Sequence, residues 1–373
     1  MCVTMKLMDV AAALAEWTRQ TFPEDIALIA CYGSFVRGTA RPDSDLDFFF
    51  IPATERGYDA SMQFILAGVG FDFWPISWER AERIAAFDEP IVSVIADADV
   101  IYARFAEDAA RFQALQARIE ELQQPAERER MLVRAAATLK NAYALEENVR
   151  RAARQADTAA VRREAISLLT VILTALAFIN QTYYHAGWGA NFTEVFALPK
   201  KPEGLETTVE DLLGGREPVG LVAAAERLIE GVRDLLQSEW EALPGKRPSA
   251  DSMKGYYEEA KSSFNKINAA CRAGDWKTAL LTLKSVEDDV RYLLQVVEAG
   301  KALPGPFAAF ECDGAIRKRG LLQTDLAFRN PGSAEIQAAS EALEQALVSF
   351  LEDEDVELRI FETMQDFRRA LFS

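Results

Sequence analysis

The hydrophobic pattern changes character once along this chain, close to Phe105, and that change limits the fold to two kinds of structure joined in sequence. Before it, short apolar runs alternate with turn-rich segments, which is typical of strands. After it, long segments rich in Ala, Leu, Arg and Glu keep a helical period, and strand-like alternation disappears. The pattern predicts an α+β fold: a small mixed sheet with flanking helices, followed by an all-α helical bundle and a C-terminal helical extension.

Two segments containing Pro and Gly divide the helical part further. Residues 244–249 form the clearest internal linker, and Pro304-Gly305-Pro306 begins the C-terminal piece. We therefore predict a first domain over residues 1–105, a helical bundle domain over 106–300 and an extension over 301–373. One helix of that extension carries a shared apolar stripe made of Ile336, Leu343, Leu347 and Phe350.

The expected strands and helices follow from the strand-like and helical periods of the apolar residues. The first domain is predicted to hold a helix over 5–21, strands over 25–32, 45–51 and 69–76, a helix that begins at Trp78, and one or two short strands over 92–102. The long helices are predicted over 106–123, 126–155, 158–185, 216–240, 252–272 and 275–299.

Composition narrows the class of partner. The net charge is -17, whereas a protein that binds nucleic-acid phosphates usually presents a basic face, so no nucleic-acid substrate is expected. The most apolar stretch, 165–179, is shorter than the roughly twenty apolar residues that a membrane span needs, so no membrane partner is expected. Four scattered cysteines without a CxxC pair, and the lack of a signal peptide, predict a cytoplasmic location.

Three aspartates in the first domain form the candidate catalytic group. Asp45 and Asp47 stand two residues apart on an expected strand, so their carboxylates project from the same face. Asp72 lies within another, otherwise apolar strand, where an unpaired charge would be costly. Carboxylate oxygens are the ligands that Mg²⁺ prefers, and converging acids without a metal would repel one another. The pattern favours a site for divalent metal over a solvated strand face.

A tight turn precedes these acids. An apolar strand enters Gly33-Ser34, and the basic, polar segment that follows contains Arg37. Such a turn supplies backbone N–H groups and a hydroxyl for phosphate oxygens, and a guanidinium suits the same task. Nucleotidyl transfer needs these parts together, because it must hold a triphosphate, align a hydroxyl and stabilise the leaving pyrophosphate.

The segment GSFVRGTARPDSDLDFFFI (Gly33 to Ile51), with FDFWPIS (Phe71 to Ser77) behind it, resembles the DNA polymerase β-type nucleotidyltransferase superfamily. More narrowly, it resembles the bacterial branch that includes the kanamycin-type aminoglycoside nucleotidyltransferases. The resemblance covers residues 25–80, is architectural over the helices to about residue 300, and is absent from the remainder. It implies that residues 1–105 form a nucleotidyltransferase domain.

The resemblance also implies roles for individual residues. Asp45, Asp47 and Asp72 would be the catalytic acids and would hold two Mg²⁺ ions. The donor would be ATP or another nucleoside triphosphate, with its phosphates bound by Gly33, Ser34 and Arg37.

A departure from the family occurs on the second domain. In the kanamycin enzyme a Glu and a Lys, four residues apart on a helix, serve as general base and phosphate ligand. The matching segment here, Thr138 to Val149, has Ala or Asn where that Glu is expected. Lys140 is the candidate nucleotide ligand, with Glu146 and Glu147 nearby, and the general base stays open.

His185 is the only histidine of the chain. It is expected in the last turn of the helix over 158–185, where an imidazole can cap carbonyls and interact well with the helix dipole. Toxin RNases with helical domains of this general sort place an Arg four to six residues before such a His, and no Arg occurs in Phe178 to Tyr184, which argues against that class. The aromatic and amide-rich segment 180–191 either lines a small-molecule cleft or forms an ordinary helix end.

These observations lead to one principal function and two alternatives. The chain is expected to be an enzyme that transfers a nucleoside monophosphate, AMP from ATP, to a hydroxyl of a small-molecule acceptor such as an aminoglycoside-like antibiotic. The alternatives are an AMPylating enzyme of the antitoxin type, which modifies a protein, and a non-catalytic nucleotide-binding regulator. The resemblance also suggests a homodimer, since the kanamycin enzyme builds its sites between two subunits.

Overall fold

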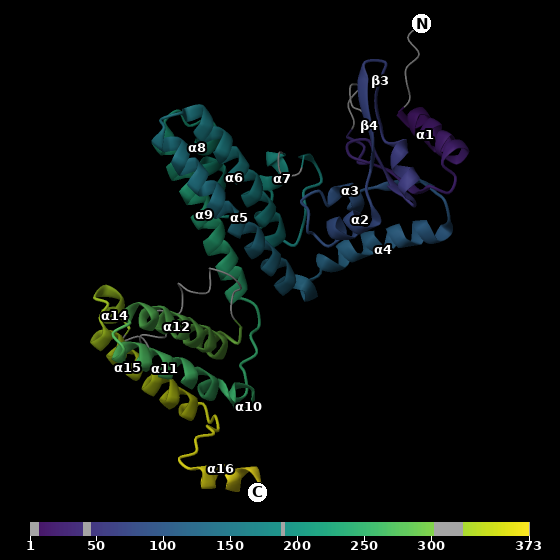
Figure 1. Ribbon diagram of the computed structural model, residues 1–373. Coiled ribbons are helices and arrows are strands. Elements are labelled where there is room, and N and C mark those ends of the chain that lie inside the picture. Colours follow the sequence, from purple (N-terminus) through teal and green to yellow (C-terminus); the bar gives the residue numbers. More distant parts are fainter. Residues whose placement is uncertain (1–6, 40–45, 188–190, 302–323, 373) are drawn as a thin grey trace. The chain divides into compact units, whose positions relative to one another are not determined.

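The computed structural model describes residues 7–39, 46–187, 191–301 and 324–372. Two compact units follow one another along the chain, Met1–Trp240 and Glu241–Ser373. The first contains a sheet and a bundle of long helices, and the described part of the second is helical (Figure 1). The structure therefore confirms the α+β class and the change from mixed to helical structure after the first hundred residues.

Five strands form one mixed sheet in the order β3-β4-β2-β1-β5. Only β2 and β4 run parallel, and the other neighbours pair antiparallel. The apolar run of β1 is buried from end to end except at its last residue, which is typical of a strand covered on both faces. The strands are β1 (Ile26–Tyr32), β2 (Asp47–Pro52), β3 (Met62–Leu66), β4 (Val69–Pro75) and β5 (Asp99–Ala103).

Helices complete the first unit on both sides of the sheet and beyond it. They are α1 (Leu7–Thr21), η1 (Glu55–Ala60), α2 (Trp78–Ala85), α3 (Ser93–Ala96), α4 (Ala106–Leu122), η2 (Pro125–Glu127), α5 (Arg128–Arg154), α6 (Thr158–Ile179), α7 (Phe192–Phe196), α8 (Leu205–Gly214) and α9 (Pro218–Glu241). Among the described residues, no helix is both long enough and apolar enough to cross a membrane.

Three consecutive phenylalanines hold β2 in place. Phe48 and Phe50 belong to the core cluster that includes the apolar side chains of α1. Phe49 points to the opposite face, where its ring lies 6.0 Å from that of Phe112 on α4. A slip of one residue would exchange these two faces, so burial of the rings fixes the register of β2 and with it the position of Asp47 at the start of the strand.

The structure differs from the sequence-based expectation in several short elements. β3, α7 and α8 were not anticipated, and residues 92–102 form the helix α3 and the strand β5 rather than strands alone. β3 lies at the edge of the sheet and its side chains are half-buried or exposed, so its sequence lacks a buried face to reveal it. Short elements of this kind are positioned by tertiary contacts more than by their own period.

The helix expected over 158–185 ends earlier, at Ile179. Asn180 closes it: its side-chain Nδ2 donates to the carbonyl oxygens of Leu176 at 2.8 Å and of Lys200 at 2.7 Å. Gln181 then takes a positive φ of 51°, which directs the chain away from the helix axis. The expectation that His185 caps the last turn of this helix is therefore wrong, and residues 180–187 lead to a different location.

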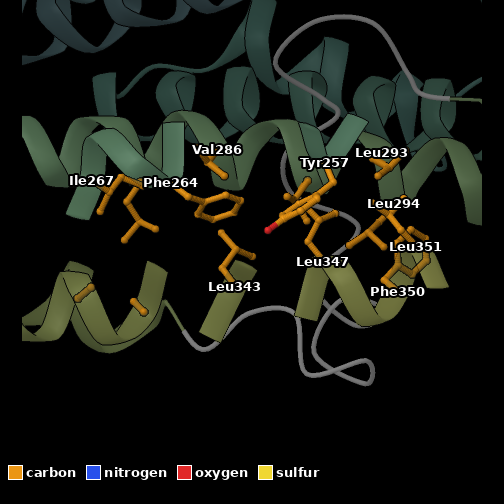
Figure 2. Close-up of a cluster of buried hydrophobic side chains, with 14 of the residues drawn as sticks. Tyr257, Phe264, Ile267, Val286, Leu293, Leu294, Leu343, Leu347, Phe350 and Leu351 are labelled. Atoms are coloured by element: carbon orange, nitrogen blue, oxygen red, sulfur yellow. The ribbon is translucent and has the colours of Figure 1, made fainter. Parts of the chain in front are cut away.

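The second unit packs helices from distant parts of the sequence around one core. α11 (Tyr256–Arg272), α12 (Trp276–Ala299) and α15 (Ser333–Asp353) bury their apolar faces against one another (Figure 2), and shorter helices are α10 (Ala250–Met253), α14 (Asp325–Arg329) and α16 (Met364–Leu371). The stripe expected on the C-terminal helix is confirmed, because all four of its residues are buried. This core joins residues on both sides of position 300, whereas the sequence-based division placed a boundary there.

Two leucines on α12 test this core. Leu283 is fully buried among the three helices, whereas Leu281 on the same helix is 75% exposed. We expect Leu283→Ala to lower the opening free energy of the second unit by about 2–5 kcal/mol, because it removes buried methyl groups and leaves a cavity. Leu281→Ala should change it by less than about 0.5 kcal/mol. Hydrogen exchange of the α11, α12 and α15 amides measures both, and equal effects would contradict the described packing.

Candidate active site

The turn after β1 is closed by its own backbone. The N–H groups of Arg37 and Thr39 donate to the carbonyl oxygens of Gly33 and Ser34 at 3.3 and 2.8 Å. The N–H groups that precede them in the turn, those of residues 34–36, have no hydrogen-bond acceptor in the described parts of the chain. Adjacent N–H groups left open in this way form a concavity suited to a phosphate oxygen.

Asp47 lies directly against this turn. It is the first residue of β2 and pairs with Tyr32, the last residue of β1. A Cβ atom built on Gly33 would lie only 2.1 Å from Asp47 Oδ2, and Gly33 takes a positive φ of 84°. Only glycine fits both the backbone conformation and the space, so the carboxylate and the turn are placed together by close contact.

Asp72 lies beside Asp47 on the neighbouring strand. β4 runs parallel to β2 with Phe73 opposite Phe48, so the preceding residues, Asp72 and Asp47, are neighbours in the same register. Alternation puts both side chains on the face that carries Phe49. Asp72 is exposed, and its Oδ1 accepts a hydrogen bond of 2.7 Å from Gln63 Nε2. The pair presents hard oxygen donors at one end of the sheet, a donor set that fits Mg²⁺.

The third expected acid, Asp45, falls outside the described residues. Among the described residues, no three His, Cys, Asp or Glu side chains come together closely enough to hold a metal ion. The strand register thus places two of the three expected carboxylates on adjacent strands at the same end of the sheet.

Arg37 carries a guanidinium nitrogen without an acceptor. The side chain is half-buried, and its Nη1 atom is buried with no hydrogen-bond partner among the described residues. Leaving a charged donor buried and unsatisfied costs free energy, and phosphate oxygens are the acceptors that a guanidinium binds best. Arg37 therefore suits the phosphate role that the sequence predicts for it.

Lys140 stands apart from this group. It lies on the exposed side of α5, and within the described part of the chain no hydrogen bond or ion pair joins it to the end of the sheet. The two acids beside it are engaged in ion pairs on the same helix. Glu146 contacts Arg150 at 2.5 Å, and Glu147 contacts Arg154 at 3.2 Å.

A cluster that the sequence reasoning missed occupies the same end of the sheet. Asp97 follows α3, and Asp99 two residues later pairs with Cys31 near the end of β1. The segment after α6 brings two side chains to Asp97. Tyr183 Oη donates to Asp97 Oδ1 at 2.8 Å, and His185 Nδ1 lies 2.8 Å from Asp97 Oδ2.

His185 is fixed from its backbone side as well. Glu194 on α7 accepts hydrogen bonds from the N–H groups of His185 and Ala186, at 2.8 and 3.4 Å. The imidazole ring packs on Tyr183, with centroids 4.7 Å apart. The side chain of Asp97 is 15% exposed and that of His185 is 51% exposed, so the pair has a covered carboxylate and an accessible imidazole.

The electrostatics of this pair are set mainly by Asp97. Its hydrogen bond raises the pKa of His185 above the usual 6.5, while partial burial and the positive charge of Arg37 act in the opposite direction. The contribution of the pair to stability is therefore complete below pH 6.5 and is lost as the pH rises through the raised pKa. Burial and the bond to Asp97 also raise the pKa of Tyr183, so its hydroxyl keeps its proton.

Comparisons with known proteins identify two domains in this chain. Residues 13–98 match the model of the nucleotidyltransferase domain, and residues 109–240 match that of the KNTase C-terminal domain. A solved nucleotidyltransferase-like protein from Exiguobacterium sibiricum is 12% identical, with 62% of this chain and 75% of that chain covered and a TM-score of 0.38. No curated protein matches.

The fold and the two matched domains define a nucleotidyltransferase enzyme. Residues 13–98 are similar to the nucleotidyltransferase domain, and residues 109–240 are similar to the C-terminal domain of the kanamycin nucleotidyltransferase type. The resemblance expected from Gly33 to Ile51 is thereby confirmed.

Gly33 provides a test of the close contact with Asp47. We expect Gly33→Ala to cost about 1–2 kcal/mol for the left-handed backbone and, in addition, to displace the carboxylate. Gly38→Ala is the matched control, because Gly38 also takes a positive φ, of 69°, but no atom lies within 4 Å of its added Cβ. Chemical denaturation should show a loss of stability in both variants, and calorimetry should show a loss of Mg²⁺-dependent nucleotide binding in Gly33→Ala alone. Equal nucleotide binding by the two variants would contradict the contact.

Proposed function

We propose that this enzyme transfers a nucleoside monophosphate, AMP from ATP, to a hydroxyl group of a small-molecule acceptor. The observation that carries the proposal is the position of Asp47, which is in contact with the Gly33 turn and beside Asp72 on the next strand. The Gly33 turn would hold the triphosphate, and the two aspartates would hold the cation that accompanies it.

Asp47 and Asp72, with Asp45, would hold two Mg²⁺ ions. When bound, these ions supply charge neutralisation for the triphosphate and for the departing pyrophosphate. The chain's own groups bind and orient the donor. The open N–H groups after Gly33 and the hydroxyl of Ser34 would donate to phosphate oxygens, and Arg37 would offer its unsatisfied nitrogen to them. Lys140 stays a candidate for a further phosphate contact from α5.

A small acceptor is favoured by charge and by a pocket near the site. The net charge of -17 disfavours a polyanionic acceptor such as nucleic acid and favours a cationic one. A surface pocket of about 380 Å³ lies between α5, α6 and Phe87, lined partly by Thr138, Asn141 and Thr174. The ring of Phe87 contacts that of Tyr183, which links the pocket to the Asp97 cluster. A pocket of this size and mixed polarity suits a polyhydroxylated small molecule, of which an aminoglycoside-like antibiotic is one.

A homodimer and a cytoplasmic location belong to the same proposal. The homodimer is supported by the kanamycin-type second domain, and the location by the scattered cysteines.

Radiolabel transfer tests the proposed reaction. The protein is incubated with Mg²⁺ and each α-labelled nucleoside triphosphate, with and without a panel of aminoglycosides and other polyols. We expect pyrophosphate release that depends on ATP and on an acceptor, with label on that acceptor. Label on a protein would instead indicate an AMPylating enzyme, and binding without release would indicate a regulator.

Asp47→Asn tests the role of the carboxylate. It removes metal affinity with little change in packing, so we expect the rate of transfer to fall at least about 10³-fold, which corresponds to roughly 4 kcal/mol of transition-state stabilisation. Asp59→Asn, at an exposed position on η1, is the control and should keep the wild-type rate. Comparable turnover by Asp47→Asn at saturating Mg²⁺ would overturn the assignment.

A further inference from the structure

We propose that His185, oriented by Asp97, accepts the proton of the acceptor hydroxyl during transfer. This inference rests on the proposed function and names a group that the family resemblance left open. In the step, the hydroxyl O–H bond breaks and its proton moves to His185 Nε2. The oxygen forms a bond to the α-phosphorus, and the bond from that phosphorus to the bridging oxygen breaks, so pyrophosphate leaves with the electron pair.

The orientation of the imidazole suits this task. Asp97 Oδ2 lies 2.8 Å from Nδ1, so in the neutral ring the proton resides on Nδ1 and the lone pair on Nε2. Among the described residues Nε2 has no hydrogen-bond partner, and the ring is half exposed. No described side chain has to be displaced from Nε2 when a hydroxyl approaches it.

Asp97 acts as a positioning residue. Its side chain is largely covered, and its second oxygen is fixed by the Tyr183 hydroxyl at 2.8 Å. Carboxylates held in this way keep an imidazole in one tautomer and stabilise its protonated form. Glu194 holds the backbone of His185, so the irregular segment after α6 presents the ring in one place.

The location of the cluster connects it to the phosphate site. β5 pairs with β1 at Asp99 and Cys31, two residues short of Gly33, so Asp97 lies at the end of the sheet where β1 turns. The face is the same as well, because α3 packs against α4, and Phe112 of α4 lies on Phe49. Arg37, which follows Gly33, lies close enough for its charge to lower the pKa of His185.

The acids on α5 of the helical domain are poorly suited to act as this base. Where the kanamycin enzyme uses a Glu on its helix, the neighbouring acids of α5 are each paired with an arginine. Glu146 is also nearly buried, and desolvation raises its pKa. In the described part of the chain, His185 is thus the basic group that combines exposure, a fixed tautomer and proximity to Arg37.

The groups that face the imidazole determine the pH dependence. Asp97 raises its pKa through the hydrogen bond and Glu194 adds to this effect, whereas Arg37 lowers it and Tyr183 stays neutral. The neutral ring is the proton acceptor, so the rate of transfer should decrease as the pH is lowered, with an apparent pKa above 6.5. Removing the charge of Asp97 should shift this decrease in rate to lower pH.

The single histidine allows a direct measurement. The protein with [¹³Cε1]histidine gives one imidazole resonance, which is titrated in the wild type, in Asp97→Asn and in the control Asp99→Asn, an exposed acid two residues away. We expect a lowered pKa in Asp97→Asn alone. We also expect the wild-type resonance to shift when Mg²⁺ and α,β-methylene-ATP bind, because the triphosphate then occupies Arg37. A resonance that stays unmoved by bound nucleotide would overturn the inference, whereas failure of the nucleotide to bind would overturn the proposed function instead.

Kinetics separate a base from a structural group. His185→Asn keeps an N–H donor for Asp97 but lacks a basic Nε2. With kanamycin as acceptor, or water where kanamycin is not modified, we expect pyrophosphate release to fall about 10²–10⁴-fold in both His185→Ala and His185→Asn, with nucleotide affinity unchanged. Restoration of the rate by His185→Asn would show a structural role and overturn the inference. A loss of nucleotide affinity equal to the loss of rate would overturn it as well.

Discussion

The contact between the Asp47 carboxylate and the α carbon of Gly33 is the constraint on which the site depends. It places a carboxylate oxygen that would bind metal against the turn that would hold phosphates, and it leaves no room for a side chain at position 33. The contact is possible because the register of β2 is fixed by the alternating burial of Phe48, Phe49 and Phe50. The hydrophobic core of the sheet thereby determines a polar geometry at its end.

The same end of the sheet gathers groups from distant parts of the chain. Asp72 comes from the neighbouring strand, Asp97 from the helix that precedes β5, and His185 from the segment after α6. Strand register positions Asp72, the end of α3 positions Asp97, and hydrogen bonds to Asp97 and Glu194 position His185. The early end of α6 matters most for the last of these, because a helix continued to residue 185 would carry the imidazole along its own axis.

The sequence predicted the parts of this site that are local. Gly33, Arg37 and Asp47 lie within fifteen residues, and strand period together with a familiar motif was enough to group them. Asp72 followed from one further strand. The grouping of α15 with α11 and α12, and the position of His185 beside Asp97, could not be predicted in this way, because both depend on long-range packing. α15 joins α11 and α12 across the sequence, and Asn180, which has no helical period to reveal it, ends α6. The available signal was the Asn180-Gln181 pair after an apolar run, since such polar residues often end helices.

The location of the divalent cation is the decisive measurement for this site. Crystals grown with Mn²⁺ and α,β-methylene-ATP allow the cation to be found by its anomalous scattering. We expect an anomalous peak within about 2.3 Å of carboxylate oxygens of both Asp47 and Asp72, with the triphosphate along the Gly33 turn and against Arg37. A cation and nucleotide bound elsewhere, with the Asp47 carboxylate still against Gly33 and free of metal, would contradict it.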